Sequence, residues 1–157
     1  MKQVPTEQHH DSTRRHRHRG APGHRSRQHR GARGRAGDVA WSPDGTKVAF
    51  TWTAKNGTDA DFYIDDPLDG RQPELVYEPG TPGWVLADWS ADGKALLIGR
   101  FISVNEVYLY VLDLETRKLR EVEPSKQKAG RLNAIFSGDG NGVYFTSDLG
   151  SEFQTLR

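Results

Sequence analysis

The sequence predicts an all-β fold, and three observations lead to that prediction. A five-residue turn motif, WSPDG at 41–45, returns as WSADG at 89–93 and as FSGDG at 136–140, at spacings of 48 and 47 residues. Short runs rich in β-branched and aromatic residues fill the intervals, with turn signals every ~8–12 residues. No stretch has the pattern of an amphipathic helix. Four short strands per period are typical of a β-propeller blade, so we expect a partial propeller of about two and a half four-stranded blades.

The repeated motif has the composition of a type I turn closed by a glycine. Serine caps backbone N–H groups at the first position, aspartate suits the third, and glycine supplies a positive φ at the fourth. The tolerant second position varies among Pro43, Ala91 and Gly138, whereas the other positions keep their chemistry. We therefore assign these residues a structural role and no catalytic, cofactor-binding or metal-binding role. They are Ser42, Asp44, Gly45, Ser90, Asp92, Gly93, Ser137, Asp139 and Gly140.

The strands between the turns follow in order along the chain. The first period holds runs at 48–52, 59–66 and 73–78, and the second holds runs at 95–99, 106–114 and 119–123. The runs VAFTW, ALLIG and VYLYVLDL are apolar on both faces, which suits a sheet packed between two neighbouring sheets. We accordingly interpret the tryptophans and tyrosines as packing between blades.

Charge divides the chain near Gly37. Residues 1–37 carry Lys2 and nine arginines against Glu7 and Asp11, a net charge of +8, and they contain all six histidines. The remaining residues carry 12 basic and 19 acidic side chains, a net charge of −7. Residues 1–37 are therefore predicted to be a disordered basic tail, and residues 38–157 an incomplete propeller.

Three interpretations of the basic tail stay open. Clustered arginine can neutralise phosphates, and because no aromatic side chain is present to stack on bases, such binding would be weakly sequence-selective. We do not expect a nucleic acid partner. Histidines at 9, 10, 16 and 18 can capture metal loosely, without a fixed geometry. The abrupt change to patterned sequence at Asp38 also fits a frameshift or a misplaced start, which is the interpretation that we prefer.

Residue types that are absent restrict the chemistry. Cysteine does not occur, which excludes disulfides and thiolate sites. No apolar run approaches the ~20 residues of a membrane helix, and no apolar segment follows the basic start. We therefore expect a cytoplasmic chain with no membrane contact.

Other patterns are weaker. Residues 137–148 partly match a calcium loop through Asp139, Asn141, Gly142 and Asp148, but Ser137 replaces the first aspartate, so we expect neither metal nor cofactor. The carboxylates between Asp59 and Asp69 are interpreted as solvated. The sequon at Asn56 is interpreted as a hairpin turn.

The spaced Ser-x-Asp-Gly turns, together with YVLDLETRKL at 110–119, resemble the WD-like repeats of two groups. These groups are the TolB proteins and the N-terminal propellers of the prolyl oligopeptidase family of serine peptidases. The phrases at 88–119 and 134–156, which include RFISVNE and TSDLGSEFQ, resemble the propellers of bacterial dipeptidyl and acylaminoacyl peptidases. The resemblance implies a propeller that gates access of substrates to a separate α/β-hydrolase domain.

The residues of that hydrolase domain are not found in this sequence. No G-x-S-x-G motif occurs, and no histidine follows His29, so a Ser–Asp–His order cannot be built in the patterned region. We therefore predict a substrate-gating propeller fragment that is not itself an enzyme. The alternative is a non-enzymatic, TolB-like propeller that binds proteins.

The number of repeats has a further consequence. Closed propellers have about four to eight blades. With fewer blades, strand edges and blade faces stay exposed, which favours association. We expect self-association through open blade edges, or a partner that is the missing hydrolase domain or another protein.

Overall fold

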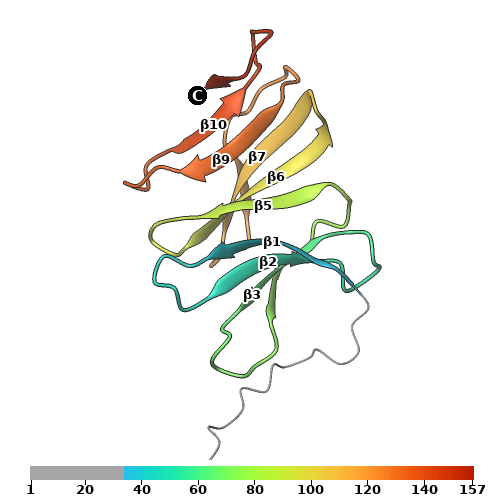
Figure 1. Ribbon diagram of the computed structural model, residues 1–157, viewed down its shortest axis with the longest axis vertical. Helices are drawn as coiled ribbons and strands as arrows, with labels where there is room; N and C mark the ends of the chain where they lie inside the picture. The colour runs from blue at the N-terminus through green and yellow to red at the C-terminus, as the bar shows by residue number, and fades with distance from the viewer. Residues whose placement is uncertain (1–33) are drawn as a thin grey trace, which may run out of the picture. The chain divides into compact units, whose positions relative to one another are not determined.

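The computed structural model describes residues 34–157, which form three antiparallel β-sheets and no helix (Figure 1). Sheet 1 contains β1 (Ala36–Trp41), β2 (Val48–Trp52), β3 (Asp61–Asp65) and β4 (Glu74–Tyr77). Sheet 2 contains β5 (Trp84–Trp89), β6 (Ala95–Ser103), β7 (Glu106–Asp113) and β8 (Leu119–Glu121). Sheet 3 contains β9 (Arg131–Phe136), β10 (Val143–Ser147) and β11 (Thr155–Leu156). The predicted all-β, partial-propeller fold is confirmed.

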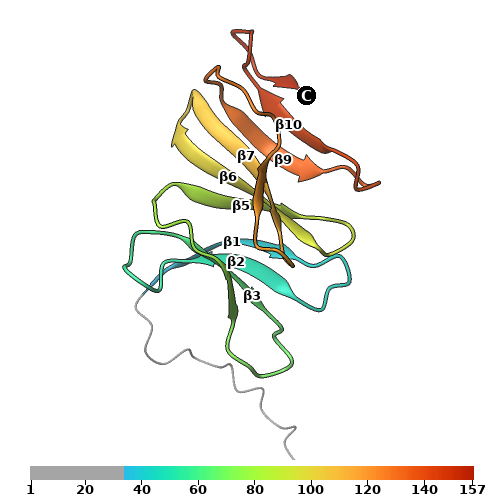
Figure 2. The same ribbon diagram turned by 180° about the vertical axis from the view of Figure 1, so that it is seen from behind.

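Each sheet is a meander in which consecutive strands are neighbours. The first strands of the sheets, β1, β5 and β9, lie next to one another in turn, and sheet 2 stands between sheets 1 and 3 (Figures 1 and 2). β1 begins at Ala36, before the boundary expected at residue 38, because Ala36 pairs with Trp52 and the Thr53 N–H donates to the Arg35 carbonyl. The rest of the predicted tail, residues 1–33, lies outside the described residues.

Sheet 2 is buried on both faces. Leu96 and Ile98 of β6 pack with sheet 1, whereas Leu97 between them packs with sheet 3, and all three side chains are fully buried. Successive strand residues point to opposite faces, so three consecutive buried residues require a neighbour on each side. Trp84 packs between sheets as expected, with its ring centroid 6.0 Å from that of Tyr77 of sheet 1 and 5.4 Å from that of Tyr110 of its own sheet. Trp41 and Tyr144, in contrast, are exposed.

Two aspartates tie neighbouring sheets together through their backbones. Asp38 Oδ2 accepts a hydrogen bond from the Leu86 N–H at 3.1 Å, and Asp88 Oδ2 accepts one from the Phe136 N–H at 2.8 Å. Each bond joins residues 48 positions apart, which is one repeat. Both aspartates lie at irregularities of the first strand of their sheet, next to Gly37 in β1 and Ala87 in β5. A bulge turns these side chains towards the next sheet.

The junction between sheets 2 and 3 should weaken when Asp88 is replaced. We predict that Asp88→Ala lowers the free energy of unfolding by about 1.5–3 kcal/mol, the range for hydrogen bonds to charged groups. Urea unfolding followed by tryptophan fluorescence measures this loss. Glu152→Ala removes an exposed carboxylate outside the junctions and should leave the free energy of unfolding unchanged. Equal losses in the two variants would contradict the role given to Asp88.

Candidate functional site

The three Ser-x-Asp-Gly turns share one hydrogen-bond geometry. In each, the serine hydroxyl donates to the aspartate Oδ1, at 2.6 Å for Ser42, 2.7 Å for Ser90 and 2.6 Å for Ser137. The serine Oγ in turn accepts a backbone N–H from five residues after the serine, and the glycine N–H donates to the serine carbonyl at 2.9 Å. The turn glycines, Gly45, Gly93 and Gly140, have φ values of 69°, 73° and 74°. A positive φ is readily adopted only by glycine, which explains why this position does not vary.

These hydrogen bonds lower the pKa of the turn carboxylates. The Ser42 hydroxyl, followed by the Thr46 backbone and side chain, lowers the pKa of Asp44 from 3.8 to about 2. The hydroxyls of Ser90 and Ser137 lower the pKa of Asp92 and of Asp139 in the same way. A general base works best with a pKa near the working pH. The Ser–Asp pairs are therefore unsuited to activate a nucleophile.

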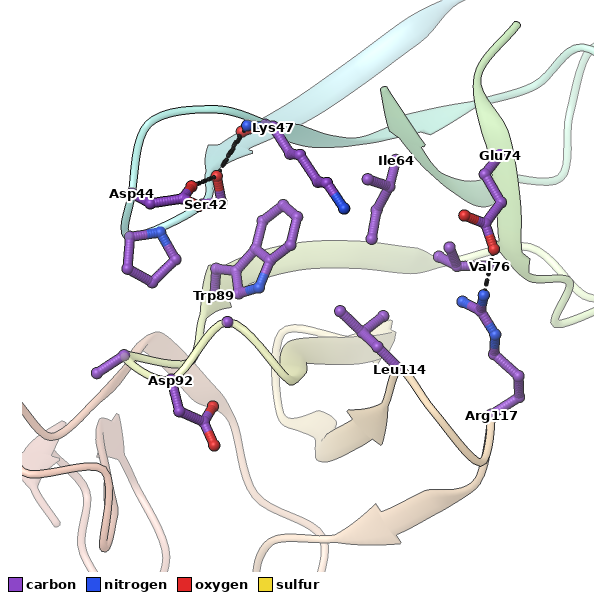
Figure 3. A pocket seen from close by; sticks show the side chains of 13 residues that line it. Ser42, Asp44, Lys47, Ile64, Glu74, Val76, Trp89, Asp92, Leu114 and Arg117 are labelled. Atoms are coloured by element: carbon purple, nitrogen blue, oxygen red, sulfur yellow. Dashed lines mark hydrogen bonds and ion pairs between the residues drawn. The ribbon is translucent and has the colours of Figure 1, made fainter. Parts of the chain in front are cut away.

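A pocket of about 440 Å³ opens between sheets 1 and 2 at the end that carries these turns (Figure 3). The Trp89 indole lies in the middle of the view, the Ser42 turn on one side, and the Glu74–Arg117 ion pair on the other. Trp89 is buried, and its Nε1 donates to no partner within residues 34–157. Apolar side chains of Ile64, Val76 and Leu114 complete the lining. Residues 34–157 contain no histidine or cysteine, so the pocket offers neither an imidazole base nor a thiolate.

The opposite end of the sheets carries a different surface, which we call the rim. It consists of the β6–β7 hairpin tip, residues 101–104, and the β10–β11 loop, residues 148–154. Four exposed apolar side chains lie there: Phe101, Ile102, Val104 and Phe153, of which Val104 is 70% exposed and Phe153 76%. Exposed apolar side chains grouped on one surface mark sites of interaction.

The connection from β8 to β9 holds the two parts of the rim together. The Gly130 N–H donates to Asp148 Oδ1 at 2.7 Å, and the Val107 N–H donates to the Ala129 carbonyl at 2.9 Å. A Cβ on Gly130 would lie 2.6 Å from the Val104 carbonyl oxygen and 3.2 Å from Gln154 Nε2. The hairpin tip and the loop therefore meet at Gly130, where no larger residue fits.

A buried arginine fixes this connection, and sequence reasoning did not find it. Arg131 is 3% exposed; its Nη1 donates to the Val107 carbonyl at 3.0 Å, and its Nε donates to Glu123 Oε2 at 3.1 Å. Beside it, Lys128 Nζ pairs with Glu106 Oε2 at 2.8 Å. The Lys128 and Tyr108 hydrogen bonds lower the pKa of Glu106. The only indication of this role in the sequence was that a charged residue, Arg131, begins the largely apolar segment RLNAIF that precedes the third turn.

The calcium-loop pattern, the sequon at Asn56 and the acidic cluster each have a defined place in the structure. Asp139 belongs to its turn and Asp148 to the rim, and among residues 34–157 no three carboxylate or imidazole groups lie together as metal ligands would. Asn56 Oδ1 accepts the N–H groups of Thr58 and Asp59, as in a turn. The interpretation of the acidic cluster as solvated is wrong for Asp61. This residue opens β3 and is 2% exposed, and burial raises the pKa of its carboxyl.

The repeated sheets, the shared turns and the inner first strands define a segment of a β-propeller. No family model matches the sequence. TolB from Acinetobacter baumannii is similar, with 26% identity and a TM-score of 0.61 over 78% of this chain and 29% of that one. Apo prolyl oligopeptidase B from Galerina marginata gives 22% identity and a TM-score of 0.56 over 75% of this chain and 18% of that one.

An oligogalacturonate lyase from Vibrio parahaemolyticus also matches, with 21% identity and a TM-score of 0.57 over 78% of this chain and 35% of that one. The predicted likeness to the propellers of TolB and of prolyl oligopeptidases is confirmed. The chain spans about a fifth to a third of the length of these proteins. Within residues 34–157, no helix is suited to cross a membrane.

The turns predict a dependence of stability on acid. The pKa of Asp44 is about 2 in the fold and 3.8 ordinarily. Its stabilisation is therefore complete above about pH 3.8 and is lost as the pH falls through about 2. We expect Asp44→Asn to lower the urea midpoint at pH 7, and the midpoints of the variant and the unchanged chain to converge towards pH 2. Glu152→Gln should reproduce the pH profile of the unchanged chain. Parallel profiles for Asp44→Asn and the unchanged chain would contradict this account.

Proposed function

We propose that this chain is a non-catalytic part of a propeller that binds an extended polypeptide at the rim. The observation that carries the proposal is the group of exposed apolar side chains on a backbone held from within by Arg131 and Gly130. Loops on a fixed scaffold are where binding residues concentrate. A surface that is ordered before binding loses less conformational entropy when the partner arrives.

The chemistry of the rim favours an apolar segment of polypeptide. Phe101, Ile102, Val104 and Phe153 supply side chains to bury. Of the charged residues beside them, Glu106 and Lys128 pair with each other, and Glu152 is exposed. Burying one such side chain fully contributes about 1.5–3 kcal/mol. Recognition would depend on apolar contacts and on backbone hydrogen bonds.

The TolB-like version of this function is supported by the 26% identity to the Acinetobacter protein. In that version the chain is an interaction module. A second version is a gating propeller for a prolyl-oligopeptidase-like peptidase. It is favoured by the phrases RFISVNE and TSDLGSEFQ, which resemble peptidase propellers and fall on the two halves of the rim. In that version the rim filters substrates for a hydrolase domain carried elsewhere.

Binding without cleavage is the expected result of the test. Fluorescein-labelled β-casein, an unstructured polypeptide, is titrated with the full chain, and its anisotropy reports binding while gel electrophoresis reports its length. Val104→Asp and Phe153→Asp should each weaken binding at least about tenfold, since losing the burial of one side chain costs more than about 1.4 kcal/mol. The labelled casein should stay intact.

Leu68→Asp is the matched control. Leu68 is 86% exposed and lies in the β3–β4 turn, outside the rim. This variant should bind as the unchanged chain does. Equal binding by all variants would exclude the rim, and cleavage of casein that persists after purification to homogeneity would exclude a non-catalytic role. Circular dichroism confirms that each variant keeps its β-sheet content.

A further inference from the structure

Sheet 1 has one face that no other described sheet covers. Ala49, Phe62 and Val76 point into the core shared with sheet 2. Strand alternation places the residues between them on the opposite face. Phe50 and Tyr63 stack there with ring centroids 5.8 Å apart, opposite each other on β2 and β3. The other apolar members of this face, which we call face 1, include Trp52, whose ring centroid lies 5.4 Å from that of Tyr63, and Val39, Trp41 and Leu75, with exposures of 65%, 60% and 44%.

The internal repeat identifies the kind of surface that fits face 1. Trp41 occupies the repeat position of Trp89 and Phe136, because each precedes its Ser-x-Asp-Gly turn. Trp89 is only 6% exposed because it packs against sheet 1, and Phe136 packs in the core between sheets 2 and 3. Face 1 is therefore the face that, in the other two sheets, is covered by the preceding sheet of the repeat.

The complementary surface is present at the other end of the array. Tyr144 of β10 is 51% exposed and pairs with Ile135 of β9, which is 53% exposed. Tyr144 occupies the repeat position of Ala49 and Leu97, both fully buried against the following sheet. We call the surface formed by Leu132, Ile135 and Tyr144 face 3. It is the face that, in sheets 1 and 2, receives the next sheet.

The backbone junction also has a counterpart at this end. Asn133 lies at the repeat position of Asp38, whose carboxylate accepts the N–H of Leu86 in the following sheet. Asn133 is exposed, and its Nδ2 donates to Thr146 Oγ1 at 3.2 Å. Its Oδ1 accepts no hydrogen bond within the described part of the chain, so it can accept one from a following sheet.

We propose that face 3 of one copy of this chain docks on face 1 of a second copy. The junction repeats the two that already exist within the chain, sheet 1 on sheet 2 and sheet 2 on sheet 3. Two copies joined in this way at both ends contribute six sheets, a number within the range of about four to eight that closes a propeller. The contact joins unlike faces, and closure limits the assembly to a dimer instead of an open filament.

The absence of cysteine from the sequence makes this arrangement directly testable. Val39→Cys places one thiol on face 1, and Ile135→Cys places one on face 3, both on first strands that are neighbours at the existing junctions. The two full-length variants are mixed in equal amounts and treated with a short bismaleimide cross-linker. We expect the mixture to give a cross-linked dimer, with little product from either variant alone. Light scattering of the unchanged chain should give twice the chain mass.

Matched variants separate the outcomes. Leu68→Cys mixed with Ile135→Cys should give no cross-link, because Leu68 lies on neither face. Trp41→Asp should reduce the mass to that of one chain while the circular dichroism spectrum is retained, and Leu68→Asp should stay dimeric. A monomeric unchanged chain, or cross-links from Val39→Cys alone, would overturn the proposal. None of these residues belongs to the rim, so the result is independent of the casein experiment.

Discussion

The fold depends on one packing constraint: a sheet that is apolar on both faces needs a neighbour on each. In β6, Leu96, Leu97 and Ile98 are consecutive and fully buried, which only sheets 1 and 3 together achieve. Removing either neighbour would expose part of this strand to water. Sheet 2 is thus the centre of the described structure, and the same constraint leaves faces 1 and 3 exposed at the ends.

The turns and the aspartate bonds set how the sheets are arranged around that centre. Each Ser-x-Asp-Gly turn closes on itself through the serine hydroxyl and fixes the hairpin between the first two strands of its sheet. Asp38 and Asp88 then join first strands across the junctions. One end of the array is therefore built from tight turns with buried serines, while the β6–β7 and β10–β11 connections at the other end form the rim.

Much of this arrangement could be predicted because it is periodic. The spacing of the turns predicted the sheets. The doubly apolar runs VAFTW, ALLIG and VYLYVLDL predicted sheets with a neighbour on each face, which holds for sheet 2 but, among the described residues, not for VAFTW of sheet 1. The bonds made by Asp38 and Asp88 could not be predicted in this way. Asp38 lies three residues before Trp41, whereas Asp88 lies one residue before Trp89, so the two aspartates do not occupy the same position of the repeat. The irregularities in β1 and β5 determine where their side chains point.

The rim was recognised only as two phrases of sequence. Arg131 fixes the connection that holds the two parts of the rim together. It is buried because it contacts Val107 and Glu123, which lie 24 and 8 residues away in the sequence. Likewise, Asp61 is buried at the start of β3, beside the fully buried Phe62. Burial of single charged residues follows from the packing of the sheets, which composition does not reveal.

Amide hydrogen exchange of the full chain tests most directly whether burial on both faces organises the fold. If it does, the amides of Leu96, Leu97 and Ile98 in β6 exchange more slowly than any others among residues 34–157. The amides of β2 and β10, in sheets with only one neighbour in the chain, then exchange measurably faster in dilute solution. Equal exchange rates in β2, β6 and β10, or slowest exchange outside sheet 2, would contradict the account.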